Sequence, residues 1–126
     1  MRIFPVLLDS RPAYLGGRGR SGSLLLCPLG TNVLVEHLSH WLRPVTTHTP
    51  LVVSQGPTEA DYVRWITEGS PGAEVLAAPQ DVADVVTTYE MSDALLIVDP
   101  RCLPRRAHEF SSLVERYCEV FGSWPK

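Results

Sequence analysis

Hydrophobic positions along the chain fall into short apolar runs that alternate with amphipathic segments. Continuous apolar runs lie at residues 3–8, 49–54 and 94–99, with a weaker one at 73–78. Such runs are typical of strands buried on both faces of a parallel sheet. Segments with apolar residues at helical spacing occupy residues 32–42, 59–68, 81–89 and 107–120. In the second of these, Tyr62, Trp65 and Ile66 share the apolar side.

The alternation of apolar runs and helical segments predicts successive βαβ units with right-handed crossovers. We therefore expect an α/β protein, a Rossmann-like three-layer sandwich with a mostly parallel sheet. A chain of 126 residues is of ordinary size for one domain. Residues 1–121 are expected to form that domain, and residues 122–126 to be a tail or the start of a linker.

The composition is that of a globular protein, with 44% hydrophobic and 20% charged residues. A formal net charge of −3 provides no broad basic field, so nucleic acid is not an expected partner. The N-terminal apolar run is too short for a signal or a membrane span, and we predict a cytoplasmic protein without a membrane partner. Cys27, Cys102 and Cys118 lack zinc-type spacing and are predicted to be buried free thiols.

In a doubly wound sheet, ligands bind beyond the carboxyl ends of the strands. The loop at residues 9–23, the turn at 54–56 and Asp99 with its successors are expected there. The loop arginines, Arg11, Arg18 and Arg20, are either an anion clamp for phosphate or part of a solvated loop. Asp99 is either a magnesium ligand or a carboxylate that caps the following turn.

Residues 24–42 read L-L-L-C-P-L-G-T-N-V-L-V-E-H-L-S-H-W-L, an apolar segment, a turn and a helix that Thr31 or Asn32 can cap. This segment resembles P-L-L-P-V-G-G-K-P-L-L-E-H of the sugar-1-phosphate nucleotidyltransferases. The order of elements over about the first 100 residues is similar to the N-terminal, nucleotide-binding part of that family. The resemblance implies a nucleotide or sugar nucleotide as ligand, in polysaccharide or glycoconjugate synthesis, with Asp99 at the position of the family's magnesium-binding aspartate.

The glycine loop of that family is not found where the resemblance places it. The family has A-G-G-x-G-T-R after its first strand, where backbone amides approach the triphosphate, but this chain has Asp9-Ser10-Arg11-Pro12. A similar string lies about seven residues further along. The predicted nucleotide-binding residues are Arg11, Gly16, Gly17, Arg18, Gly19 and Arg20. Losing such a loop costs orders of magnitude in rate, so we predict a degenerate relative, a pseudoenzyme with no assigned catalytic residue.

Two other functions stay open. One is a non-catalytic protein-interaction or oligomerisation module on the same scaffold, expected as a homodimer. The other is an active sugar-phosphate nucleotidyltransferase that uses Mg²⁺ and an unusual loop. His37 and His40 have a metal-type spacing but no third ligand, and are predicted to be a surface pair. A basic cluster of Arg101, Arg105 and Arg106 is predicted to begin a charged helix.

Overall fold

The computed structural model describes residues 2–9, 23–55, 58–77, 79–90 and 92–102, together with residues 109, 112, 113, 115 and 116. The strands in this part are β1 (Ile3–Asp9), β2 (Pro28–Leu29), β3 (Asn32–Val33), β4 (Leu51–Ser54), β5 (Glu74–Leu76) and β6 (Ala94–Val98). The helices are α1 (Leu34–Leu42), α2 (Ala60–Gly69) and α3 (Pro79–Val86). Most of the helix predicted at 107–120 lies outside the described residues, and so do residues 122–126.

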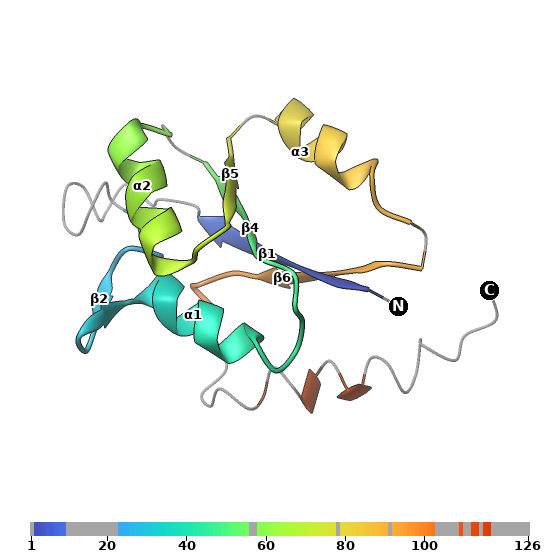
Figure 1. Cartoon of the computed structure of the whole chain (residues 1–126), viewed down its shortest axis with the longest axis horizontal. Helices are drawn as coiled ribbons and strands as arrows, with labels where there is room; N and C mark the ends of the chain where they lie inside the picture. Colours follow the sequence, from blue (N-terminus) through green and yellow to red (C-terminus); the bar gives the residue numbers. More distant parts are fainter. Residues whose placement is uncertain are drawn as a thin grey trace.

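Four strands form one sheet in the order β5-β4-β1-β6, and every neighbouring pair is parallel. Leu7 is opposite both Val52 of β4 and Val98 of β6, which fixes the register of β4, β1 and β6. Figure 1 shows the strands running side by side, with α1 and α2 next to each other at one end of the view. The prediction of an α/β fold with a parallel sheet in a Rossmann-like sandwich is confirmed.

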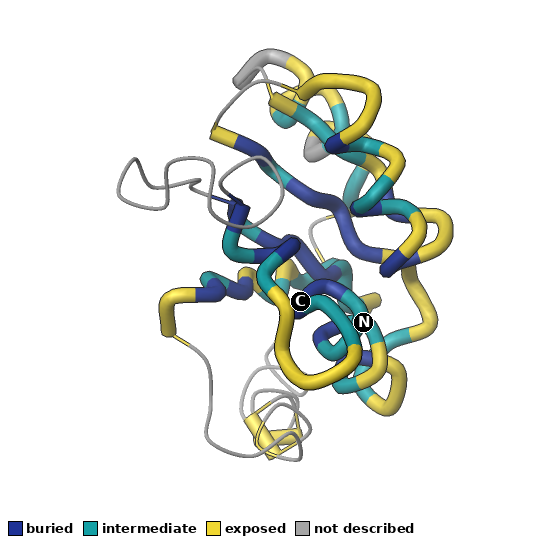
Figure 2. Tube along the Cα trace, turned by 90° about the vertical axis from the view of Figure 1, so that its left-hand side faces the viewer, coloured by how far each residue is buried: buried dark blue, intermediate teal, exposed yellow. Residues whose placement is uncertain are grey.

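The core lies between the sheet and the pair α1 and α2. Because side chains alternate between the faces of a strand, the face that carries Leu7, Val52 and Val98 is the one covered, and all three are buried. Leu38 of α1 and Ile66 of α2 belong to the same buried cluster. Figure 2 colours the Cα trace by residue burial, with buried residues (dark blue) toward its interior and many exposed residues (yellow) on its outer bends. This face is therefore filled by side chains.

The opposite face of the sheet is reached by the connection from β5 back to β6. That connection includes α3 and passes β4 and β1, and a right-handed crossover places it opposite α1 and α2. Phe4 points to this face, where its ring stacks on Tyr89 with centroids 4.2 Å apart. At the outer strand the same face carries Leu95 and Ile97, which are 41% and 59% exposed. Apolar surface is thus left uncovered along β6.

The first helix begins two residues later than predicted. Asn32 and Val33 pair with Leu29 and Pro28 in a small antiparallel hairpin, whose turn uses Gly30 at φ +71°. That positive φ favours glycine. The predicted caps are therefore wrong, since Val33 is the N-cap residue and makes no side-chain capping bond. The hairpin takes Asn32 out of the helix.

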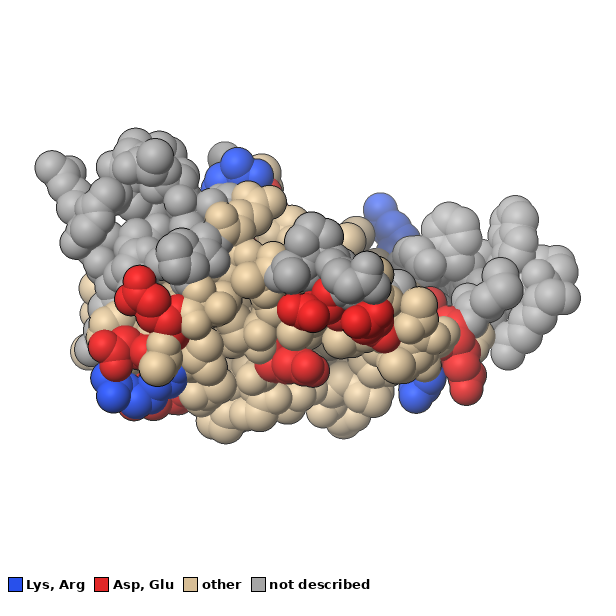
Figure 3. Space-filling view, turned by 90° about the horizontal axis from the view of Figure 1, so that it is seen from above, with Lys and Arg blue, Asp and Glu red and all other residues tan. Residues whose placement is uncertain are grey.

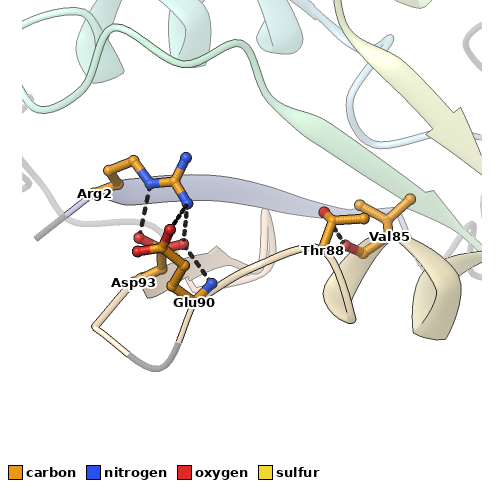
Figure 4. Close-up of polar contacts among 5 residues, drawn as sticks. All are labelled: Arg2, Val85, Thr88, Glu90 and Asp93. Atoms are coloured by element: carbon orange, nitrogen blue, oxygen red, sulfur yellow. Dashed lines mark hydrogen bonds and ion pairs between the residues drawn. The ribbon is translucent and has the colours of Figure 1, made fainter.

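An ion pair joins the start of β1 to the start of β6. The Arg2 guanidinium donates to both carboxylate oxygens of Asp93, at 2.9 and 2.7 Å (Figure 4). The Ala94 amide donates to the Arg2 carbonyl. The hydrogen bonds from Arg2 lower the pKa of Asp93, whose ordinary value is 3.8. The Glu90 amide also donates to Asp93 at 2.8 Å. This pair sets where β6 begins against β1.

Candidate functional site at the carboxyl edge

The carboxyl ends of β1 and β6 lie next to each other in the sheet, with Leu7 opposite Val98. After β1 the chain continues toward β4, whereas β6 lies on the other side of β1. A reversal of strand order of this kind is where open α/β sheets bind ligands. Asp9 ends β1 and Asp99 follows β6, so the two residues singled out from the sequence lie on neighbouring strand ends.

Asp9 is the centre of a buried polar network. Its side chain is fully buried, and Oδ2 accepts hydrogen bonds from the Ser23 hydroxyl and, at 2.6 Å, from the Tyr62 hydroxyl. Oδ1 is buried and has no hydrogen-bond partner among the described residues. Both hydroxyls thus donate to the same carboxylate oxygen, while the other carboxylate oxygen keeps its acceptor capacity.

Each partner of Asp9 comes from a different element. Tyr62 lies on the first turn of α2 and faces the core, so its hydroxyl needs a buried partner. Ser23 begins the segment before the hairpin, and its carbonyl accepts from the Leu26 amide at 3.3 Å and the Cys27 thiol at 3.4 Å. Ser54 of β4 is opposite Asp9 and also buried. The network joins β1, α2 and the entry to the hairpin.

Sequence reasoning placed Tyr62 on the apolar side of its helix but did not connect it with Asp9. The sequence pattern placed Ser23 at the end of a loop and gave it no role in a site. The signal that could have linked them is the tyrosine hydroxyl itself, because an inward tyrosine directs its polar tip to a hydrogen-bond partner. The nearest candidates are polar residues at strand ends, and Asp9 is one of them.

Asp99 caps the turn that follows β6. Its Oδ1 accepts from the Arg101 amide at 2.9 Å, and its Oδ2 accepts from the Arg101 Nη2 at 2.8 Å. The guanidinium and then the amide of Arg101 lower the pKa of Asp99. The bond from the Arg101 amide is the contact that a turn-capping carboxylate makes, one of the two roles predicted for Asp99. The predicted magnesium role stays a prediction. The pair holds the Arg101 guanidinium beside the carboxyl edge.

The amino end of α1 is already occupied by backbone groups. The Leu34 amide donates to the Cys27 carbonyl at 3.0 Å, and the Val35 amide donates to the Leu25 carbonyl at 2.8 Å. A helix start binds phosphate through such amides when they are free. Here two of these amides donate to carbonyls of the segment before the hairpin. The start of α1 therefore has few free amides that could bind an anion.

The residues predicted to bind the nucleotide, Arg11, Gly16, Gly17, Arg18, Gly19 and Arg20, all lie outside the described residues, as do Arg105, Arg106 and Cys118. Cys27 is half-buried rather than buried as predicted, and the prediction for Cys102 is wrong because that residue is exposed on the turn after β6. His37 contacts the hairpin: its Nε2 lies 2.7 Å from the Leu29 carbonyl.

The described residues provide no broad basic surface in the view of Figure 3 and no cluster of metal ligands. Figure 3 shows acidic and basic side chains interspersed on the face it presents, without a continuous basic area among the residues it colours. Within the described residues, no three His, Cys, Asp or Glu side chains gather as a metal site would require. None of the described helices is both long and apolar enough to cross a membrane.

Comparison of the chain with models of protein families, with curated proteins and with solved structures found no match. The resemblance to sugar nucleotidyltransferases therefore stays a prediction. What the structure establishes is the α/β fold and the grouping of Asp9, Ser23 and Tyr62 beside Asp99 and Arg101 at one edge of the sheet.

Proposed function

We propose that this domain binds a nucleotide or sugar nucleotide at the carboxyl edge between β1 and β6 and does not catalyse its transfer. The observation that carries the proposal is the reversal of strand order at β1, where β4 and β6 lie on opposite sides. Ligands of α/β sheets bind at this point because the connections diverge there and leave a crevice.

The charged groups at this edge support an anionic ligand. Asp9 is fully buried, with its Oδ1 out of reach of a ligand, and it immediately precedes the loop that contains Arg11. On the other side, Asp99 holds the Arg101 guanidinium at 2.8 Å, where it can meet an anion from the rim. A cation at the strand ends suits the phosphates of a nucleotide.

We infer that the edge does not catalyse transfer because its candidate catalytic groups are already hydrogen-bonded within the protein. Two amides at the start of α1 bind carbonyls, and both oxygens of Asp99 bind Arg101. Phosphoryl transfer depends on donors and metal ligands that point at the transferred group. An edge with these groups committed can hold a ligand but stabilises a transition state poorly.

The proposal is tested by titrating the ¹⁵N-labelled chain with UDP-glucose, GTP, CTP and ATP, each with and without Mg²⁺. Saturable shifts are expected for the amides of Asp9, Gln55 and Arg101, with no release of pyrophosphate when a sugar phosphate is added to a nucleoside triphosphate. Arg101→Gln should weaken binding, and Arg64→Gln on the outer side of α2 should not. No shifts at millimolar nucleotide would refute binding, and steady turnover would refute the loss of catalysis.

A second candidate function, a protein-interaction or oligomerisation module, is favoured by the uncovered residues of β6. Leu95 and Ile97 are exposed, and β6 pairs with β1 only among the described strands. An exposed apolar edge strand readily pairs with another chain. Sedimentation equilibrium is expected to show a dimer that Ile97→Lys dissociates, while a monomer at all concentrations would remove this candidate.

A further inference from the structure

The two edge strands of the sheet differ in length and in charge. β5 is three residues long and begins with Glu74, which is exposed. β6 is five residues long, contains no charged residue and no proline, and exposes the apolar side chains of Leu95 and Ile97. A short edge strand with a charge is protected from pairing with other chains, whereas a longer apolar one is not. Of the two edges, the one at β6 is therefore better suited to accept a further strand (Figure 1).

The backbone groups that β6 directs away from β1 are those of Leu95 and Ile97. The Ala94 amide donates to the Arg2 carbonyl, so the backbone of Ala94 faces β1. Because successive residues of a strand direct their backbone groups to opposite sides, Leu96 also faces β1, and Leu95 and Ile97 face outward. None of the described strands pairs with that side of β6. These two residues thus present two amides and two carbonyls at the edge.

The spacing of these two residues makes the edge self-complementary. If a second β6 runs antiparallel about a two-fold axis at Leu96, Leu95 of each copy lies opposite Ile97 of the other. Opposed residues whose backbone groups point at each other form the hydrogen-bonded pairs of an antiparallel ladder, and each pair exchanges two bonds. Axes at Leu95 or Ile97 would instead set the other of these residues against a position beyond the strand ends. The register centred on Leu96 therefore satisfies the outward groups best.

The same register also pairs the exposed apolar side chains. Leu95 and Ile97 project from the face of the sheet that carries Phe4, opposite α1 and α2. Directly opposed residues of an antiparallel pair have Cβ atoms about 5 Å apart and interact. Each Leu95 would contact Ile97 of the second copy on this face, and on the other face Leu96, which packs against the core, would meet its own counterpart. Pairing would thus cover the apolar surface that the single chain leaves exposed.

The charged groups at the two ends of β6 are complementary in an antiparallel arrangement. The amino end has two carboxylates, Glu90 and Asp93, beside the one guanidinium of Arg2, and the Glu90 side chain is 74% exposed. At the carboxyl end, Asp99 pairs with Arg101. Antiparallel pairing sets Asp93 opposite Asp99, but each of these carboxylates is held by its own arginine. The additional carboxylate of Glu90 is brought toward Arg101 of the second copy rather than toward a second Glu90, which favours this orientation over a parallel one.

We propose that β6 is a dimerisation strand, to which a second copy of this chain adds its own β6 antiparallel about a two-fold axis at Leu96. The two four-stranded sheets become one continuous sheet whose remaining edges are the short, charged β5 of each copy. The interface is isologous, since the same residues of both copies form it. This inference rests on the second candidate function, an oligomerisation module, and adds the partner and the register.

Disulfide trapping in the full chain tests the register. Leu96 of the two copies forms a non-hydrogen-bonded pair, in which the Cα atoms lie about 4.5 Å apart, within the range of a disulfide. In a background of Cys27→Ala, Cys102→Ser and Cys118→Ser, the Leu96→Cys variant is expected to oxidise to a covalent dimer. Ala94→Cys is the matched control, because its two copies lie about 13 Å apart, four residues along the strand. It should remain monomeric on a non-reducing gel.

A charge exchange at the exposed positions is a second test, which leaves the buried core unchanged. Leu95→Glu and Ile97→Lys should each dissociate the dimer in sedimentation equilibrium. The double variant should dimerise more tightly than either single one, because each new carboxylate then lies opposite the new ammonium group of the other copy. Glu74→Gln changes the charge of the other edge strand and should leave the dimer intact.

The outcomes separate this inference from the candidate function on which it rests. A chain that is monomeric at all concentrations would refute both. A dimer that Ile97→Lys dissociates, but in which Ala94→Cys cross-links as readily as Leu96→Cys, would refute the register and leave the oligomerisation module standing. Failure of the double variant to recover dimerisation would also refute the register. A dimer that neither charged variant dissociates would show that the interface lies elsewhere.

Discussion

The two edges of the sheet differ in how their polar groups are engaged. At the carboxyl edge, Asp9 accepts from Ser23 and Tyr62, Asp99 holds Arg101, and the amides at the start of α1 bind carbonyls. At the amino edge of β4, the Ser70 hydroxyl is buried without a described partner and Arg43 has no described ion pair. Each edge thus has one buried polar atom without a described partner, Asp9 Oδ1 and Ser70 Oγ, and the edge that the fold favours for ligands is the one whose other described groups are engaged with each other.

The difference between the two edges shows that strand topology and hydrogen bonding determine different properties of a site. Topology places a crevice at the carboxyl ends of parallel strands irrespective of sequence. Which groups are free to bind is decided by individual hydrogen bonds, and an unmet bond is costly enough to be informative. The two ends of α2 show the same difference. The Tyr62 hydroxyl near its start has a hydrogen-bond partner, and the Ser70 hydroxyl just after its end has none among the described residues.

The largest effect is expected from Asp9→Ala. It leaves the buried hydroxyls of Ser23 and Tyr62 without their acceptor, and each such loss costs about 1 to 3 kcal/mol. We therefore expect the free energy of unfolding to fall by about 2 to 4 kcal/mol in urea titrations. Asp61→Ala, on the exposed side of α2, is the control and should change it little. Equal stability of both variants would show that the network does not hold the edge.

Tyr62→Phe comes next, since it removes one donor and keeps the ring. A loss of about 1 to 2 kcal/mol is expected from the bond to Asp9. In the Asp9→Ala background the same change should cost nothing and should restore up to about 1 kcal/mol, because the hydroxyl is then buried without its partner. A double-mutant cycle measures that difference. Additive losses would mean that Tyr62 acts through packing alone.

Ser70→Ala is expected to act in the opposite direction. Removing a buried hydroxyl that has no partner relieves its desolvation cost and should stabilise the free protein by up to about 1 kcal/mol. The urea midpoint of the variant against that of the unaltered chain checks the sign. A loss of stability as large as that of Tyr62→Phe would indicate that Ser70 is satisfied and would remove the contrast between the two ends of α2.

The smallest effect concerns acid pH and Asp93, on the amino edge. Arg2 lowers the pKa of Asp93 below 3.8 in the folded state, so this carboxylate stabilises the fold above that pH and ceases to do so as the pH falls through the lowered pKa. Asp93→Asn should therefore reduce stability at pH 7 and lose its effect on further acidification. Urea midpoints between pH 2 and 7 check this, and a difference that persists at pH 2 would contradict it.

The sequence by itself determined the order and type of the main elements. Apolar runs such as residues 94–98 are too short for buried helices and are bounded by polar residues, so the sequence predicts strands there. Burial on both faces was also predicted, and for β6 this is wrong, because Leu95 and Ile97 are exposed. Parallel pairing followed from the helical segments between them. Asp9 and Asp99 were placed on one edge by this argument alone, and they lie on neighbouring strand ends.

Only the tertiary structure decided the partners of those residues and the strand order. The carboxyl group of Asp9 meets Ser23 and Tyr62, which are 14 and 53 positions away, and no local pattern encodes such a meeting. The hairpin that delays α1 to Leu34 likewise depends on pairing across a turn. Local propensities and hydrophobic spacing act over a few residues, whereas hydrogen bonds between distant side chains exist only once the sheet has brought their elements together.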